Sequence, residues 1–129
     1  MNNNEIRELL VKEKKLENAC RCHGRYFESY KELQKYRESL SEIFKEDGQS
    51  VLAARVDRRS LKSEMNHYLD ISYLQADELD VGYGEIKNNL RKALEIAVKY
   101  GFDEDEVRNT CDRVQKMYNR RLKQMENGR

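Results

Sequence analysis

Apolar residues between Asn4 and Asp47 recur at alternating steps of three and four, the spacing of one side of an α-helix. The two interleaved series are Leu9, Leu16, His23, Tyr30, Arg37, Phe44 and Ala19, Tyr26, Leu33, Leu40. They occupy the a and d positions of a seven-residue repeat, which is typical of coiled coils. The chain has no proline, and Gly24 is the one glycine inside this stretch. The pattern predicts a single helix over residues 4–47, roughly 65 Å long at ~1.5 Å per residue.

A second helical pattern follows after a short link. Gly48 can adopt the left-handed conformation that ends a helix. Apolar positions at steps of three and four then extend over residues 50–100. Gly82 and Gly84 flank Tyr83 in this region, and glycine disfavours a helix interior. The region is therefore either one helix with a weak point or two helices broken near residues 81–84. Because the apolar spacing carries across the glycines, we favour one continuous helix that is kinked near residues 82–84. The short link makes the first two helices antiparallel neighbours.

The boundary of a third helix is marked by its capping residues. Gly101 is placed to end the preceding helix, and Asp103 is followed three residues later by Glu106, as in a capping box. The third helix is expected over residues 103–126. The sequence therefore predicts an all-α protein in a single domain, residues 1–129. Its predicted form is a long, coiled-coil-like antiparallel helical hairpin with a shorter third helix packed back on it.

The composition leaves the predicted fold unchanged but argues against several kinds of partner and against a disulfide framework. There are 25 basic and 24 acidic residues, a net charge of +1, so there is no global attraction to nucleic acid or to an anionic membrane. No apolar run is long enough to span a membrane, and the first residues do not resemble a secretory signal. The cysteine count is three, an odd number that does not suit a disulfide framework. We expect a cytoplasmic protein with reduced thiols and no membrane partner.

Residues 20–23, Cys-Arg-Cys-His, are the one cluster that suggests metal chemistry. A tetrahedral zinc site needs four ligands, and Cys111 and His67 are the only further cysteine and histidine. Cysteine also packs as a small apolar residue, and we favour packing over metal binding. The chain has no glycine-rich phosphate loop, no Glu-x-x-His pair and no nucleophile elbow. We expect no enzyme activity, no cofactor and no small-molecule substrate.

Two basic stripes and two tyrosines are the candidate interaction residues. The stripes are Arg55, Arg58, Arg59, Lys62 and Arg113, Lys116, Arg120, Lys123; the tyrosines are Tyr36 and Tyr73. Basic stripes can follow phosphates or an acidic partner, and tyrosine is favoured in protein interfaces. The function we expect is protein–protein interaction, as an adaptor, chaperone or regulatory factor. A nucleic-acid-associated factor that uses the stripes is the alternative. A homodimer is expected, because the third helix is too short to cover a 65 Å seam.

A second alternative rests on a resemblance. Tyr73-Leu-Gln-Ala-Asp77 and Tyr100-Gly-Phe-Asp-Glu104 are similar to the Tyr-x-x-x-Asp/Glu signal of helical hairpin proteins associated with type VII secretion. The resemblance implies a small helical hairpin that is exported in the folded state. The Trp-x-Gly turn of the core family is absent, because the chain has no tryptophan.

Overall fold

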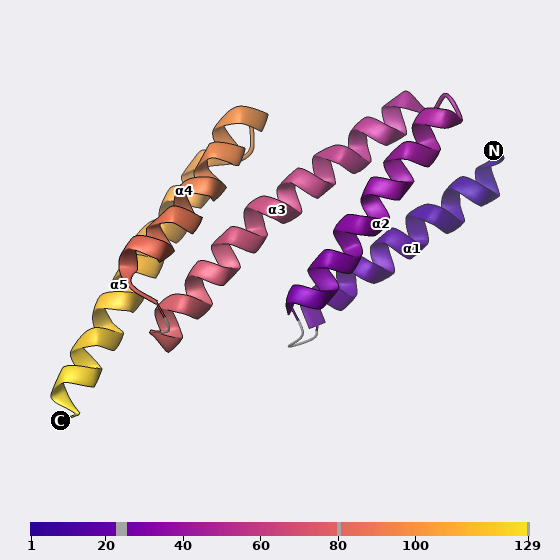
Figure 1. Ribbon diagram of the computed structural model, residues 1–129. Coiled ribbons are helices and arrows are strands. Elements are labelled where there is room, and N and C mark those ends of the chain that lie inside the picture. The colour runs from indigo at the N-terminus through magenta and orange to yellow at the C-terminus, as the bar shows by residue number, and fades with distance from the viewer. Residues whose placement is uncertain (23–25, 80, 129) are drawn as a thin grey trace. The chain divides into compact units, whose positions relative to one another are not determined.

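The computed structural model describes residues 1–22, 26–79 and 81–128 of the chain. These residues form five helices and no strand (Figure 1). The helices are α1 (Asn3–Cys22), α2 (Tyr26–Glu46), α3 (Ser50–Glu78), α4 (Tyr83–Tyr100) and α5 (Glu104–Asn127). The predicted all-α class is confirmed. The predicted arrangement of a hairpin with one further helix is not confirmed.

The single helix predicted over residues 4–47 is wrong. Two helices, α1 and α2, lie side by side and run in opposite directions (Figure 1). Leu9 and Leu10 of α1 pack against the buried cluster to which Leu40 and Phe44 of α2 belong. The apolar repeat was identified correctly as the buried face, but its two halves cover one another. Gly24, the glycine inside this stretch, lies outside the described residues.

The continuous helix predicted over residues 50–100 is also wrong. The first helix of this region ends at Glu78, and Leu79 has a φ of 55°, a left-handed conformation that is unusual for a side chain of this size. The next helix begins at Tyr83 after an extended N-cap residue, Gly82. Apolar spacing continues across the break because α3 and α4 bury their apolar faces in the same core.

The local signals at the helix ends are found in the structure as predicted. Gly48 and Gly101 have φ values of 74° and 73°, which are open to glycine at little cost. The Asp103 side chain accepts a hydrogen bond from the Glu106 backbone N–H at 3.1 Å. The first residue of α5 is Glu104, one residue after the predicted start of the third helix.

The chain divides into two compact units, where the sequence led us to expect one domain. Unit 1 is Met1–Ser60 and unit 2 is Leu61–Arg129, so the boundary falls within α3. The core of unit 1 contains Leu40, Phe44, Ala53 and Val56. The core of unit 2 consists of residues from α3, α4 and α5. They are Met65, Leu69, Ala76, Ile86, Leu90, Ala93, Ala97, Val107 and Val114.

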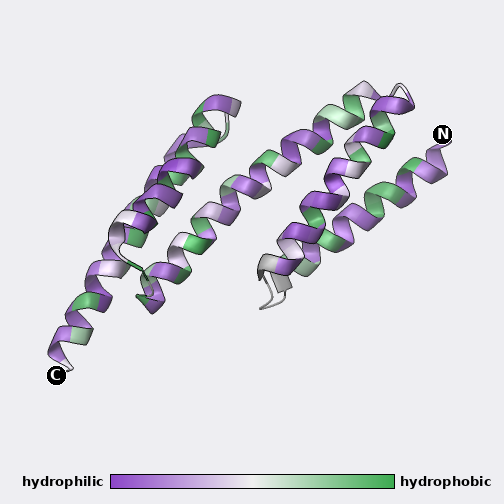
Figure 2. Ribbon diagram, in the orientation of Figure 1, coloured by the Kyte–Doolittle hydropathy of each residue, from purple (hydrophilic) through white to green (hydrophobic). Residues whose placement is uncertain are grey.

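Hydrophobic and hydrophilic residues alternate along every helix, as expected for helices that are buried on one side (Figure 2). None of the helices in the described ranges is long and apolar enough to cross a membrane.

Candidate functional site

The first basic stripe is divided between solvent and the interior of the protein. Arg55, Arg58 and Lys62 are exposed on α3. Arg59 instead turns toward α1, where its Nε and Nη2 donate to the Glu13 carboxylate at 3.0 and 2.6 Å. One edge of the Arg59 guanidinium is therefore occupied by a carboxylate and is not available to a phosphate. The stripe is therefore weaker as a nucleic-acid surface than its sequence suggested.

Arg59 belongs to a buried charge network in unit 1 that joins three helices. Arg37 of α2 is 1% exposed. Its Nε donates to Glu13 at 2.8 Å and its Nη2 to Glu17 at 3.0 Å. Burial by itself would raise the pKa of Glu13, but hydrogen bonds from Arg59 and Arg37 outweigh it and hold the pKa below its usual value of 4.5. Glu13 therefore stays ionised at neutral pH, and together with Glu17 it balances the charges of the two arginines.

Sequence reasoning missed this network, although a signal for it was present. Arg37 occupies a position in an otherwise largely apolar series, and a charge buried there needs an opposite charge nearby. Glu13 and Glu17 lie four residues apart and so share a face of α1. The pairing itself depends on the packing of α1 against α2, which the sequence did not predict.

The second basic stripe is fully on the surface. Arg113, Lys116, Arg120 and Lys123 are all exposed on α5. None of them forms an ion pair or hydrogen bond with another described residue. Their charges are therefore available to a partner.

Tyr36 and Tyr73 have packing roles in the structure. The Tyr36 hydroxyl donates to the Leu9 carbonyl at 2.7 Å and so ties α2 to α1, and Lys12 Nζ lies 5.2 Å from its ring centroid. Tyr73 is half-buried against the core of unit 2. Asp77, which completes the secretion-like spacing with Tyr73, accepts a hydrogen bond from Arg121 Nε at 3.0 Å. Contacts of either tyrosine with a partner stay predictions.

No metal centre is found among the residues that the structure describes, where no group of three or more His, Cys, Asp or Glu could hold an ion. Cys20 and Cys111 are half-buried free thiols, and burial raises the pKa of each. His67 is a buried residue of unit 2 whose pKa is lowered by its burial. The side chain of Cys22 and the whole of His23 lie outside the description.

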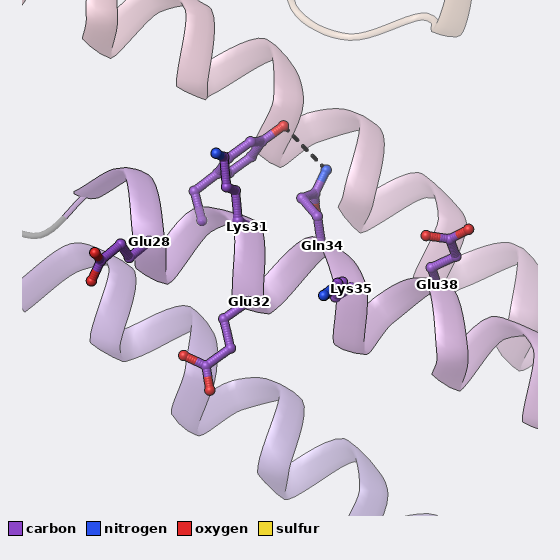
Figure 3. A pocket seen from close by; sticks show the side chains of 7 residues that line it. Glu28, Lys31, Glu32, Gln34, Lys35 and Glu38 are labelled. Carbon is purple, nitrogen blue, oxygen red and sulfur yellow. Dashed lines mark hydrogen bonds between the residues drawn. The ribbon is translucent and has the colours of Figure 1, made fainter.

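One pocket, of about 670 Å³, lies along α2 in unit 1 (Figure 3). The residues that line it are Glu28, Tyr30, Lys31, Glu32, Gln34, Lys35 and Glu38. Gln34 Nε2 donates to the Tyr30 hydroxyl at 3.3 Å and to the Ser60 carbonyl at 3.1 Å. Glu28, Glu32 and Glu38 project in different directions in Figure 3, so they do not converge on one point. The pocket mixes both signs of charge and has no acid–base pair at its centre.

A smaller groove lies between α3 and α4 in unit 2, with a volume of about 270 Å³. We call it the α3–α4 groove. Its lining residues are the apolar and aromatic Leu61, Tyr68, Ile96 and Tyr100, together with Glu64, Lys92, Glu95 and Lys99. Lys92 Nζ lies 5.3 Å from the Tyr68 ring centroid, and Lys99 Nζ lies 5.2 Å from that of Tyr100. The cations rest against aromatic faces, which leaves a surface with an apolar part and charges of both signs around it.

Comparison with known proteins adds no constraint to this description. No protein-family model matches the chain, and no curated protein or solved structure matches it. Function must consequently be inferred from the surfaces of the two units.

Proposed function

We propose that this protein acts by binding another protein, as an adaptor, chaperone or regulatory factor. The observation that carries the proposal is the α3–α4 groove. Protein interfaces combine a small apolar and aromatic centre with a polar rim, and tyrosine is enriched in them. The groove is lined by two tyrosines, two aliphatic side chains and four charged residues, which are the residue types of such an interface.

The chemistry of the groove specifies the kind of partner. At about 270 Å³ it is smaller than most small-molecule pockets, which measure ~300–1,000 Å³. It suits one or two side chains of a longer polypeptide. The partner that fits is a helical segment with aliphatic anchors at i and i+3 or i+4. Because the lining contains Glu64 and Glu95 as well as Lys92 and Lys99, the segment needs flanking charges of both signs.

Leu61 is the residue to change in a test of this proposal. It lines the groove and is half-buried, but it belongs to neither hydrophobic core. Leu61→Gln should lower the recovery of the specific partner at least ~10-fold, as expected for loss of an interface anchor. The measurement is quantitative mass spectrometry of proteins that co-purify with the tagged chain from its source cells. The matched control is Leu74→Gln on the same helix, because Leu74 is 47% exposed and outside the groove. Equal recovery of every protein by the native chain and Leu61→Gln would contradict the proposal.

Self-association remains part of the proposal, but it needs a different surface. The dimer was expected because a single helix over residues 4–47 would leave its apolar seam uncovered. In the structure α1 and α2 pack on each other and cover that seam. The nucleic-acid alternative depends mainly on the stripe of α5, since the other stripe keeps three exposed basic residues while its Arg59 is bound to Glu13. No observation favours the secretion-associated alternative.

A further inference from the structure

The outer face of α5 carries a line of polar residues with the spacing of a helical seam. The residues are Asp105, Asn109, Asp112, Lys116, Asn119 and Lys123, at alternating steps of four and three. This spacing keeps them on one side of the helix. All six are exposed, whereas Val107 and Val114 on the opposite side are buried in the core of unit 2. We call this line the α5 outer seam.

The α5 outer seam is complementary to itself when it is reversed. Asp105 and Lys123 lie nine residues on either side of Val114, Asn109 and Asn119 lie five, and Asp112 and Lys116 lie two. In two helices that run antiparallel about a two-fold axis, residues equally distant from the axis face one another. With the axis at Val114, each aspartate of one copy faces a lysine of the other. Each Asn109 faces an Asn119, and two amides can exchange hydrogen bonds.

The helix dipole explains only part of this arrangement. Acidic residues near the N-terminus and basic residues near the C-terminus stabilise any helix. The dipole acts within the first and last turn on all sides of the helix, and it does not require the charges to match position by position along one line. The opposed charges closest to the centre, Asp112 and Lys116, lie in the middle of α5, where the dipole has little effect.

The charges of the α5 outer seam are also left without an ion pair in the described part of the chain. None of its four charged residues forms an ion pair with any other described residue, although Glu104 and Arg108 of the same helix do pair, at 2.7 Å. We propose that α5 binds α5 of a second copy of this chain in an antiparallel pair along the outer seam. This assignment rests on the self-association included in the proposed function and gives it a surface.

The pairing is weak and sensitive to salt, because the seam has no apolar residue and exposed ion pairs are screened by dissolved ions. Sedimentation velocity should show a dimer at about 0.01 M salt and a monomer at about 1 M, as the screening length falls from ~30 to ~3 Å. The basic seam variant is Asp105→Lys, Asp112→Lys, and the acidic seam variant is Lys116→Glu, Lys123→Glu. Each alone should be monomeric at low salt, because like charges then face one another. An equimolar mixture of the two should form a heterodimer.

Three controls test whether the dimer depends on the seam itself and not on net charge, the groove or loss of folding. Lys15→Glu, Lys87→Glu gives the same net charge as the acidic seam variant at two exposed positions on other helices, and it should dimerise as the native chain does. Leu61→Gln should also dimerise, so that failure of the groove and failure of the seam are distinguishable. Circular dichroism checks that every variant is folded. If a charge-reversed variant is not folded, its aspartates are changed to asparagine, or its lysines to glutamine, instead. These neutral variants should also be monomeric.

Two results would overturn the proposal of an α5 pair. A native chain that is monomeric at low salt, or seam variants that self-associate as the native chain does, would refute it. A labelled DNA duplex titrated under the same conditions tests the other use of the basic residues. Duplex binding that persists at about 0.15 M salt, is lost in the acidic seam variant and occurs without self-association would assign the stripe to nucleic acid instead.

Discussion

The buried charge network of unit 1 can be tested by changing one atom group. Glu13→Gln keeps the size of the side chain and removes its charge. In the native chain the Glu13 carboxylate accepts from Arg37 Nε at 2.8 Å, from Arg59 Nε at 3.0 Å and from Arg59 Nη2 at 2.6 Å. Glutamine offers one oxygen in place of two, and its NH₂ group faces guanidinium donors. At least one of these hydrogen bonds must be lost.

The expected loss follows from the burial of each partner. A hydrogen bond to a charged group contributes about 1.5–3 kcal/mol, and breaking a buried ion pair costs about 3–5 kcal/mol. The Arg59 side chain is 39% exposed, so water compensates it in part. Arg37 is 1% exposed but keeps Glu17 at 3.0 Å. We expect the free energy of unfolding of unit 1 to fall by about 2–4 kcal/mol, which is below the full cost of a broken buried pair.

Thermal and urea unfolding followed by circular dichroism measure this change. For a unit of about 60 residues, each kcal/mol lowers Tm by about 4–8 °C, so the Tm of unit 1 should fall by roughly 8–32 °C. The control is Glu8→Gln, on the exposed side of the same helix, which should change stability by no more than about 0.5 kcal/mol. If Glu13→Gln costs less than about 1 kcal/mol, the network does not hold the three helices together and the reasoning fails.

Three further predictions concern the same unit. Because the pKa of Glu13 is lowered in the folded state, its contribution is present above pH 4.5 and is lost as pH falls through the folded value. Acid titration should therefore destabilise the native chain more than Glu13→Gln. Leu33→Ala should cost about 2–5 kcal/mol in urea unfolding, since Leu33 is 2% exposed; a cost equal to that of Ile43→Ala, at a 37% exposed position, would contradict this. Tyr36→Phe should cost about 0.5–1.5 kcal/mol through loss of the hydrogen bond to Leu9, and an unchanged urea midpoint would show that this bond contributes nothing.

The sequence alone determined what depends on a few neighbouring residues. The left-handed glycines at residues 48 and 101 and the Asp103 cap were all predicted correctly. Each signal is complete within about one helical turn. One is a glycine that can take positive φ, and the other is a side chain that accepts a hydrogen bond from the backbone N–H three residues later. The buried face of α2 was also predictable, since Leu33, Leu40 and Phe44 of the repeat are buried.

Tertiary structure decided what covers each buried face. A repeat of seven residues is equally satisfied by one long helix with an external partner and by two short helices that pack on each other. For this reason the sequence did not reveal that α1 folds back on α2. Arg37 meets a carboxylate 24 residues away, and the α3–α4 groove joins residues of two helices. Contacts between distant segments depend on where one helix ends and the next begins. A change at one such position changes all the contacts between the two helices.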